Sequence, residues 1–80
     1  MTDHKALQEQ SDRFEKIAEE LNVAADHARI TAKHYRNAEV ARAGAHAFAL
    51  QGHVSNAREL FHASARLHAS KARTEGAPDT

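Results

Sequence analysis

The sequence predicts an all-α protein, built as one long antiparallel helical hairpin. Helix breakers are scarce, with three glycines and a single proline at position 78. Alanine is the commonest residue, and it is accompanied by Glu, Lys, Arg and Gln, which are strong helix formers. No segment alternates apolar and polar residues as a half-buried strand does. A chain of 80 residues allows one domain, which we place at residues 1–73.

The first helix is predicted over residues 4–36. Thr2 or Asp3 can cap its start, because a side-chain oxygen there accepts a free backbone N–H. Two rows of residues repeat every seventh position, as in helices that pack along a heptad seam. The first row holds Leu7, Phe14, Leu21, Ala28 and Tyr35, and the second holds Gln10, Ile17, Ala24 and Thr31.

The second helix is predicted over residues 39–72, and Glu39 suits its first turn because negative charge favours a helix N-terminus. Its two heptad rows mirror those of the first helix. One row holds Val40, Ala47, Val54, Phe61 and His68, and the other holds Ala43, Leu50, Ala57 and Ser64. Residues 74–80 have no apolar periodicity, and we expect them to form a disordered tail.

A tight turn is predicted at Asn37-Ala38, because asparagine tolerates the left-handed conformation that ends helices. This turn makes the helices antiparallel, so facing residues have numbers that add to about 75. The rule pairs Phe14 with Phe61, and it also places Ala24 near Leu50. These rows are expected to form the core.

An alternative architecture is a three-helix bundle with a break near Gly52. Phe48, Gly52, Ala57 and Phe61 have spacings that resemble a tetratricopeptide-type helix-turn-helix, which would imply a partner-binding module. Glycine also weakens a helix interior by about 1 kcal/mol. We favour the hairpin because the heptad rows continue without interruption through this region.

A single hairpin buries only one seam, and small scaffolds of this kind are often stabilised by oligomerisation. Small residues line one edge of the predicted hairpin, where they would let the backbones of a second copy approach closely. Such a homodimer would be a four-helix bundle. The alternative is that alanine only fills the surface. The predicted interface comprises Ala18, Ala25, Ala32, Gly44, Ala65 and Ala72.

Histidine is unusually abundant, with seven residues. Four of them lie beside the predicted seam, on the flank opposite the small-residue edge, in rows that two glutamates continue. The antiparallel register places His46 near His27. It also places His53 near Glu20, and His34 near Glu39. The flank comprises Glu20, His27, His34, Glu39, His46 and His53.

Three interpretations of this flank are open. The residues are half-buried side chains, each hydrogen-bonded to a carboxylate or to water. Alternatively, they bind zinc, nickel or copper, because imidazole and carboxylate groups are common ligands for these ions. A third interpretation is a pH-dependent switch, because histidine titrates near neutrality. No other cofactor is indicated.

Several classes of function are disfavoured by composition. The formal net charge is zero, with 11 basic and 11 acidic residues, which argues against a nucleic-acid partner and against a polybasic membrane anchor. No hydrophobic signal segment is present, so we expect a cytoplasmic protein. No nucleophile and base have a reason to converge, so we expect no enzymatic activity. The sequence therefore predicts a small homo-oligomeric scaffold or interaction protein.

From residue 25 onward the chain resembles a group of short, alanine- and histidine-rich helical bacterial proteins of unassigned function. The resemblance rests on His34-Tyr35, His46-Ala47, Gly52-His53, Ala57, Ala65 and Leu67-His68. The sequence departs from the group in its turn, which is Asn37-Ala38 instead of Gly-Asp, and in having fewer histidines. The resemblance implies a small bacterial α-helical protein and no particular activity.

Overall fold

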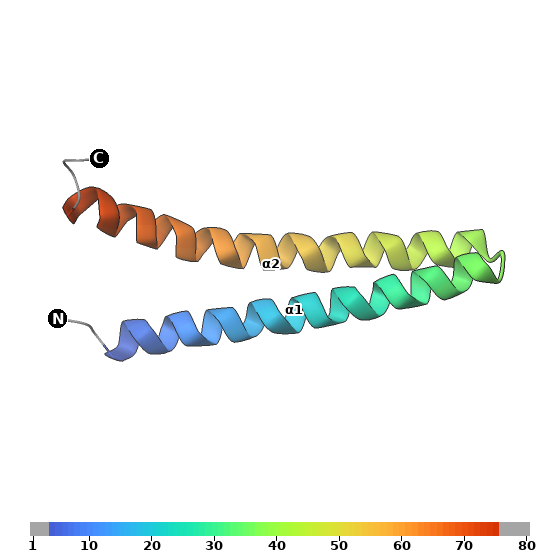
Figure 1. Cartoon of the computed structure of the whole chain (residues 1–80), viewed down its shortest axis with the longest axis horizontal. Coiled ribbons are helices and arrows are strands. Elements are labelled where there is room, and N and C mark those ends of the chain that lie inside the picture. Colours follow the sequence, from blue (N-terminus) through green and yellow to red (C-terminus); the bar gives the residue numbers. More distant parts are fainter. Residues whose placement is uncertain (1–3, 76–80) are drawn as a thin grey trace.

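The computed structural model describes residues 4–75, with side chains described for residues 4–70. It contains two antiparallel helices, α1 (His4–Arg36) and α2 (Val40–Glu75), and no strand within that range (Figure 1). The predicted hairpin is confirmed. Helix α2 ends at Glu75, three residues beyond the expected end at 72 and within the expected tail of residues 74–80. The remainder of that expected tail, residues 76–80, lies outside the described part of the chain.

The turn ends α1 with a left-handed residue, which is Ala38 (φ 60°) and not the expected Asn37. The Glu39 N–H donates to the His34 carbonyl at 2.8 Å, and the Ala38 N–H donates to the Tyr35 carbonyl at 3.0 Å. This pair of bonds is the Schellman arrangement, which satisfies carbonyls that the end of a helix leaves free. The Glu39 carbonyl then accepts the first hydrogen bond of α2, from the Ala43 N–H at 3.0 Å.

Helix α2 is continuous through Gly52. The alternative three-helix bundle with a break near Gly52 is therefore wrong, and so is the helix-turn-helix on which the tetratricopeptide-like reading depended. A Cβ atom added at Gly52 would meet nothing within 4 Å. The glycine thus serves no close contact within the hairpin, and the surrounding strong helix formers offset its low helix propensity.

The seam between the helices is made of small residues. The buried side chains are Ala24, Ala43, Ala57 and Ser64, with relative exposures of 0–8%. All four belong to the second row of their helix, so the prediction that these rows face each other is confirmed. Small side chains let the helix axes approach closely, but they bury little apolar area. Among the described residues no large side chain is fully buried.

The first rows were expected in the same core, and this is wrong. Leu7, Leu21 and Val54 remain 39–54% exposed. Phe14 and Phe61 do meet, edge to face with ring centroids 6.3 Å apart, which confirms their pairing. However, they are 47% and 53% exposed, so they meet at the rim of the seam. The contact between the helices is therefore displaced from the first rows toward the histidine side, where His53 bonds to Glu20 across the seam.

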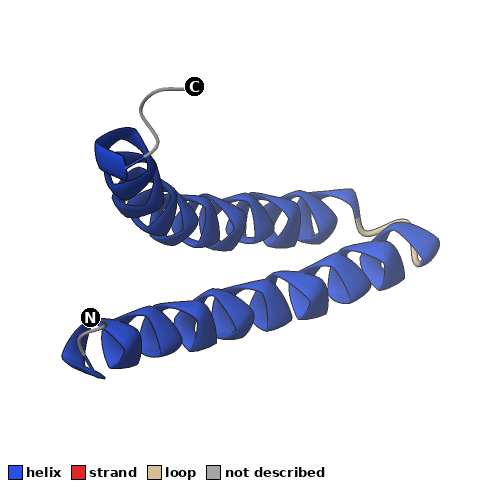
Figure 2. Cartoon of the chain, turned by 60° about the vertical axis from the view of Figure 1, so that its left-hand side comes forward, coloured by secondary structure: helices blue, strands red, loops and turns tan. Residues whose placement is uncertain are grey.

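The hairpin is long and thin, with extents of 56 × 27 × 13 Å. The two helices lie closest at the turn and separate toward the open end in both views (Figures 1 and 2). Neither α1 nor α2, over the described residues, contains a stretch long and apolar enough to cross a lipid bilayer. The fold thus leaves two long flanks on either side of one narrow seam.

Candidate functional site

One flank of the seam carries a line of six ionisable side chains, which we call the histidine ladder. Residues seven apart on a helix fall on one line along its surface when the helix packs along a heptad seam. Helix α1 contributes three members, α2 contributes two, and one lies immediately before α2. The ladder comprises Glu20, His27, His34, Glu39, His46 and His53, all partly buried.

The four imidazole rings of the ladder form one continuous row of contacts, with two stacked pairs joined by a tilted central pair. At its centre the Nδ1 atoms of His27 and His46 lie 3.0 Å apart. His34 stacks on His46 with ring centroids 5.4 Å apart, and His53 stacks on His27 at 5.6 Å. The row therefore alternates between helices, in the order His34, His46, His27, His53. These rings lie within the interface between α1 and α2, whereas the sequence predicted only that they lie beside it.

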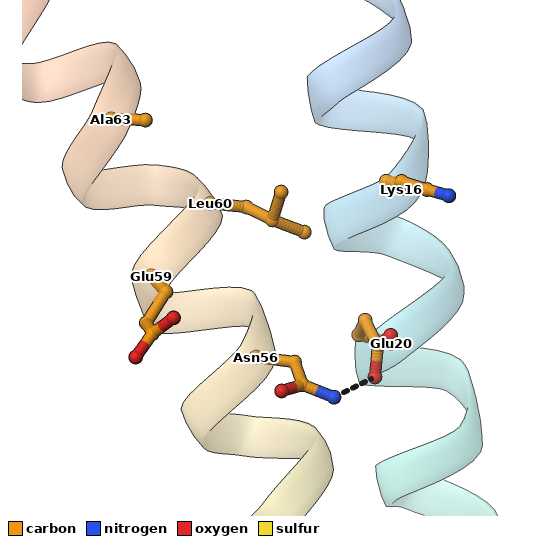
Figure 3. Close-up of a pocket in the computed structure, with 6 residues that line it drawn as sticks. All are labelled: Lys16, Glu20, Asn56, Glu59, Leu60 and Ala63. Atoms are coloured by element: carbon orange, nitrogen blue, oxygen red, sulfur yellow. Dashed lines mark hydrogen bonds between the residues drawn. The ribbon is translucent and has the colours of Figure 1, made fainter.

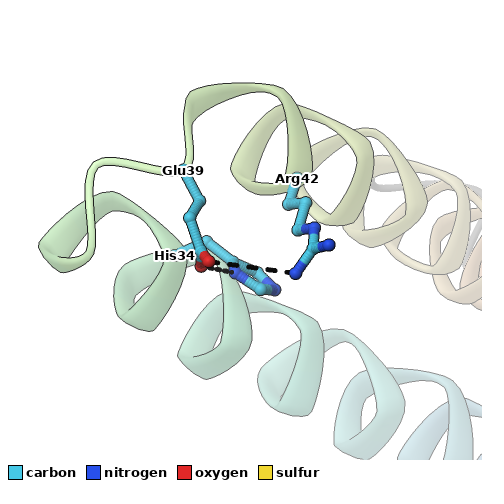
Figure 4. A network of polar contacts seen from close by, with 3 residues as sticks. All are labelled: His34, Glu39 and Arg42. Atoms are coloured by element: carbon cyan, nitrogen blue, oxygen red, sulfur yellow. Dashed lines mark hydrogen bonds and ion pairs between the residues drawn. The ribbon is translucent and has the colours of Figure 1, made fainter.

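A carboxylate closes the ladder at the end near the turn. His34 Nδ1 lies 2.7 Å from Glu39 Oε1, and the His34 side chain is only 17% exposed (Figure 4). Arg42 Nη1 lies 3.8 Å from the other oxygen of Glu39. The hydrogen bond with His34 is the main reason that the pKa of Glu39 is lowered from its usual value. This end of the ladder therefore holds a stable negative charge.

The other end has the same chemistry. His53 Nδ1 lies 2.7 Å from Glu20 Oε1, and the Asn56 amide donates to the same oxygen at 3.3 Å. These hydrogen bonds, that of His53 first, lower the pKa of Glu20. A shallow groove of about 380 Å³ opens beside Glu20 (Figure 3). Its other lining residues are Lys16, Asn56, Glu59, Leu60 and Ala63.

These contacts determine where protons are held. The outer rings, His34 and His53, each donate their Nδ1–H to a carboxylate, because an ionised carboxylate can only accept. The inner rings, His27 and His46, share one contact, in which one Nδ1 must donate and the other must accept. The ladder can therefore hold protons at defined atoms, and its inner pair has no carboxylate partner among the described hydrogen bonds.

The structure confirms the three cross-helix pairings expected from the register: His46 with His27, His53 with Glu20, and His34 with Glu39. The expected hydrogen bonds to carboxylates are confirmed for the two outer rings, whereas the inner rings bond to each other. Within the described residues no three or more His, Cys, Asp or Glu side chains are grouped so that they could hold a metal ion. Binding of zinc, nickel or copper by the ladder stays a prediction.

A second polar cluster, near the open end, was not foreseen from the sequence. Ser64 donates to Gln10 Oε1 at 2.8 Å, and Arg13 Nη1 donates to Ser64 Oγ and to Gln10 Oε1, both at 3.2 Å. Gln10 and Ser64 occupy matching positions in the second rows. Two polar residues at facing seam positions are therefore the sequence feature from which this cluster could have been predicted. The cluster links the two helices where the apolar seam is weakest.

The opposite flank of the seam is apolar, and we call it the apolar face. It has no partner within the described chain. Its large side chains are 39–65% exposed, and they are Leu7, Phe14, Leu21, Tyr35, Val40, Val54 and Phe61. A groove of about 510 Å³ lies on this flank near the open end. Phe14, Phe61 and Ala65 are among the residues that line it.

The predicted oligomer interface borders the apolar face. Its residues Ala18, Ala32, Gly44 and Ala65 are exposed, and Ala25 is half-buried. The side chain of Ala72 lies outside the described residues. A Cβ atom at Gly44 would meet nothing within 4 Å, so the hairpin itself makes no use of this glycine's small size.

Comparison with known proteins adds no assignment. No protein-family model, no curated protein and no solved structure matches the chain. The chemistry of the two flanks is therefore the basis for a proposed function.

Proposed function

We propose that this protein is a non-enzymatic homo-oligomeric helical scaffold, in which two hairpins pack their apolar faces together as a four-helix bundle. The observation that carries the proposal is the apolar face, whose large side chains are 39–65% exposed along most of the hairpin. A second copy would cover this face along its length, because a two-fold axis presents the same surface from each partner.

The area of the apolar face fits a dimer interface. Seven half-exposed large side chains present on the order of 700 Å² to water, at about 150–250 Å² for each aromatic ring and less for the aliphatic groups. A stable interface of standard size buries about 800 Å² on each partner. The neighbouring small residues, such as Ala18 and Ala32, would contribute the remainder. The amount of apolar surface is therefore what one partner of similar size requires.

The stability of the hairpin also argues for a second copy. Among the described residues the buried side chains are three alanines and one serine, and alanine contributes little area to a core. Small folded chains that lack a large core depend on oligomers, metals or disulfides, and this chain has no cysteine. The zero net charge means that two copies would not repel each other over long distances.

A scaffold function fits the polar groups as well. The described polar clusters are the histidine ladder and the Gln10–Arg13–Ser64 group. Neither cluster pairs a nucleophile with a base, and neither surrounds an enclosed cavity in which a substrate would be desolvated. We therefore propose binding and assembly as the role, with no chemical step.

The proposal is tested by matched substitutions at two phenylalanines of α2 that differ in exposure. Phe61→Glu places a charge on the apolar face, whereas Phe48→Glu places the same charge at a position that is already 80% exposed. Burying an unpaired charge in an interface is strongly unfavourable. We expect Phe61→Glu to give monomers in size-exclusion chromatography with light scattering, and Phe48→Glu to remain dimeric. A monomeric unmodified chain, or equal behaviour of the two variants, would contradict the proposal.

A further inference from the structure

We propose that the histidine ladder makes closure of the hairpin dependent on pH. The helices stay together while His27 and His46 carry at most one extra proton between them, and they separate when both rings are charged. This inference does not depend on the dimer, because the ladder lies on the flank away from the apolar face.

The proposal rests on the contact between His27 and His46. His27 Nδ1 and His46 Nδ1 are 3.0 Å apart, and both rings are half-buried between the helices. The contact is a hydrogen bond only when one of the two atoms has a free lone pair. A second proton would place two N–H groups against each other and two positive charges on rings whose centroids are 5.2 Å apart. The doubly charged pair therefore disfavours the closed hairpin.

The surroundings increase this effect. The outer rings are the groups that touch the inner pair, since His34 stacks on His46 and His53 stacks on His27. The charged groups behind them are Glu39, with Arg42 and Lys33 near it, and Glu20, with Lys16 near it. The two carboxylates bond to the outer rings, and the outer rings stack directly on the inner ones. Charging an outer ring therefore adds positive charge beside the inner pair.

The sign of the pH dependence follows from counting protons. Imidazole takes up its proton between about pH 8 and pH 5, and the His27–His46 contact of the closed hairpin admits one proton fewer than two separated rings can bind. The open chain thus binds more protons than the closed hairpin, so stability falls as the pH falls. Charging His34 and His53 against their carboxylates acts in the opposite direction. Solvent screens the His34–Glu39 pair, because the Glu39 side chain is 39% exposed, and the inner pair has no carboxylate in its described hydrogen bonds to offset a second charge.

The carboxylates do not cause a loss of stability in this range. Hydrogen bonds from His53 and His34 lower the pKa of Glu20 and of Glu39 below the ordinary value of 4.5. Their contribution is therefore present above about pH 4.5 and is lost only as the pH falls through the lowered values. A change between pH 7.5 and pH 5.0 reports on the imidazoles.

The test compares thermal unfolding of three full-length chains at pH 7.5 and pH 5.0, followed by circular dichroism at one protein concentration. In His46→Asn the amide keeps a polar atom near the position of Nδ1 but takes up no proton. In His62→Asn the same change is made at an exposed histidine of α2 outside the ladder.

We expect the unmodified chain and His62→Asn to lose at least about 5 °C in their midpoint on acidification, a shift of the size that one interaction causes in a chain this small. His46→Asn should lose less than half of that. The proposal is overturned if the unmodified chain keeps or raises its midpoint at pH 5.0, or if His46→Asn falls as far as the unmodified chain.

A measurement on the unmodified chain covers the case in which His46→Asn does not fold. The imidazole protons are followed by nuclear magnetic resonance from pH 7.5 to pH 5.0, and helicity is measured on the same samples. The proposal expects His27 and His46 to become fully charged together as helicity is lost. Full charging of both rings in a chain that keeps its helicity would overturn it.

Discussion

The two flanks of the seam differ in whether their side chains find partners within one hairpin. On the histidine ladder each outer ring reaches a carboxylate at 2.7 Å, so the polar groups find partners within one chain. On the apolar face Phe14 and Phe61 meet edge to face and still remain 47% and 53% exposed. The polar flank is thus complete in one hairpin, whereas the apolar flank is not.

The difference indicates which interactions specify each level of structure. Polar pairs are directional, so a shift in register between the helices would separate His53 from Glu20. The ladder therefore specifies how α1 lies against α2. Apolar contact is not directional and scales with the area removed from water. In the proposed dimer the apolar face would supply the driving force for assembly, whereas the ladder supplies the geometry of the hairpin.

The largest expected effect comes from truncating the apolar face. Phe14→Ala removes a ring that, in the proposed dimer, is covered by the second copy. The cost expected for such a change at a buried site is about 3 kcal/mol. Urea unfolding should show this loss at high protein concentration and a smaller loss at low concentration, because the dimer is then less populated.

Phe48→Ala is the matched control for this comparison. Phe48 is 80% exposed, so its truncation should change the free energy of unfolding by less than about 0.5 kcal/mol. Equal losses for Phe14→Ala and Phe48→Ala would remove the distinction between the apolar face and the remaining surface.

A smaller effect is expected at the turn, which sets the register of both flanks. Ala38 adopts a left-handed conformation with φ 60°, in which its Cβ is strained. Ala38→Gly should raise the free energy of unfolding by about 1 kcal/mol, because glycine has no Cβ to strain. Ala45→Gly, at an exposed position within α2, should lower it by a similar amount. A loss of stability in Ala38→Gly would contradict the described turn.

The smallest effect is expected within the seam itself. The Thr31 hydroxyl oxygen is buried and has no hydrogen-bond partner among the described residues. Thr31→Val keeps the shape and removes the unsatisfied group, so we expect a gain of roughly 0.5–1 kcal/mol in urea unfolding. A loss instead would mean that the hydroxyl has a partner in solution, and the seam would then be more polar than the structure shows.

Much of the hairpin was predictable from the sequence. Helix formers, the near absence of glycine and proline, and two uninterrupted heptad patterns specify two helices joined near residue 38. The register followed from the position of the turn, and it correctly placed His53 beside Glu20 and Phe14 beside Phe61. The predicted ladder residues are therefore together because antiparallel geometry leaves little choice once the turn is located.

The rotation of the helices about their own axes was not predictable in the same way. A heptad pattern shows that one side of a helix is apolar, but not which part of that side faces the neighbouring helix. Leu7 and Leu21 were assigned to the core because they are large and apolar. In the structure Ala24 takes the centre instead, since small residues allow close approach and the imidazoles close the seam beside it.

Sedimentation equilibrium of the unmodified chain at pH 7.5 determines whether a second copy covers the apolar face. The chain has a mass of 8.8 kDa. At protein concentrations of tens of micromolar we expect a species of twice that mass, with dissociation on dilution. A folded species that stays at the mass of one chain across the concentration range would contradict the proposed dimer.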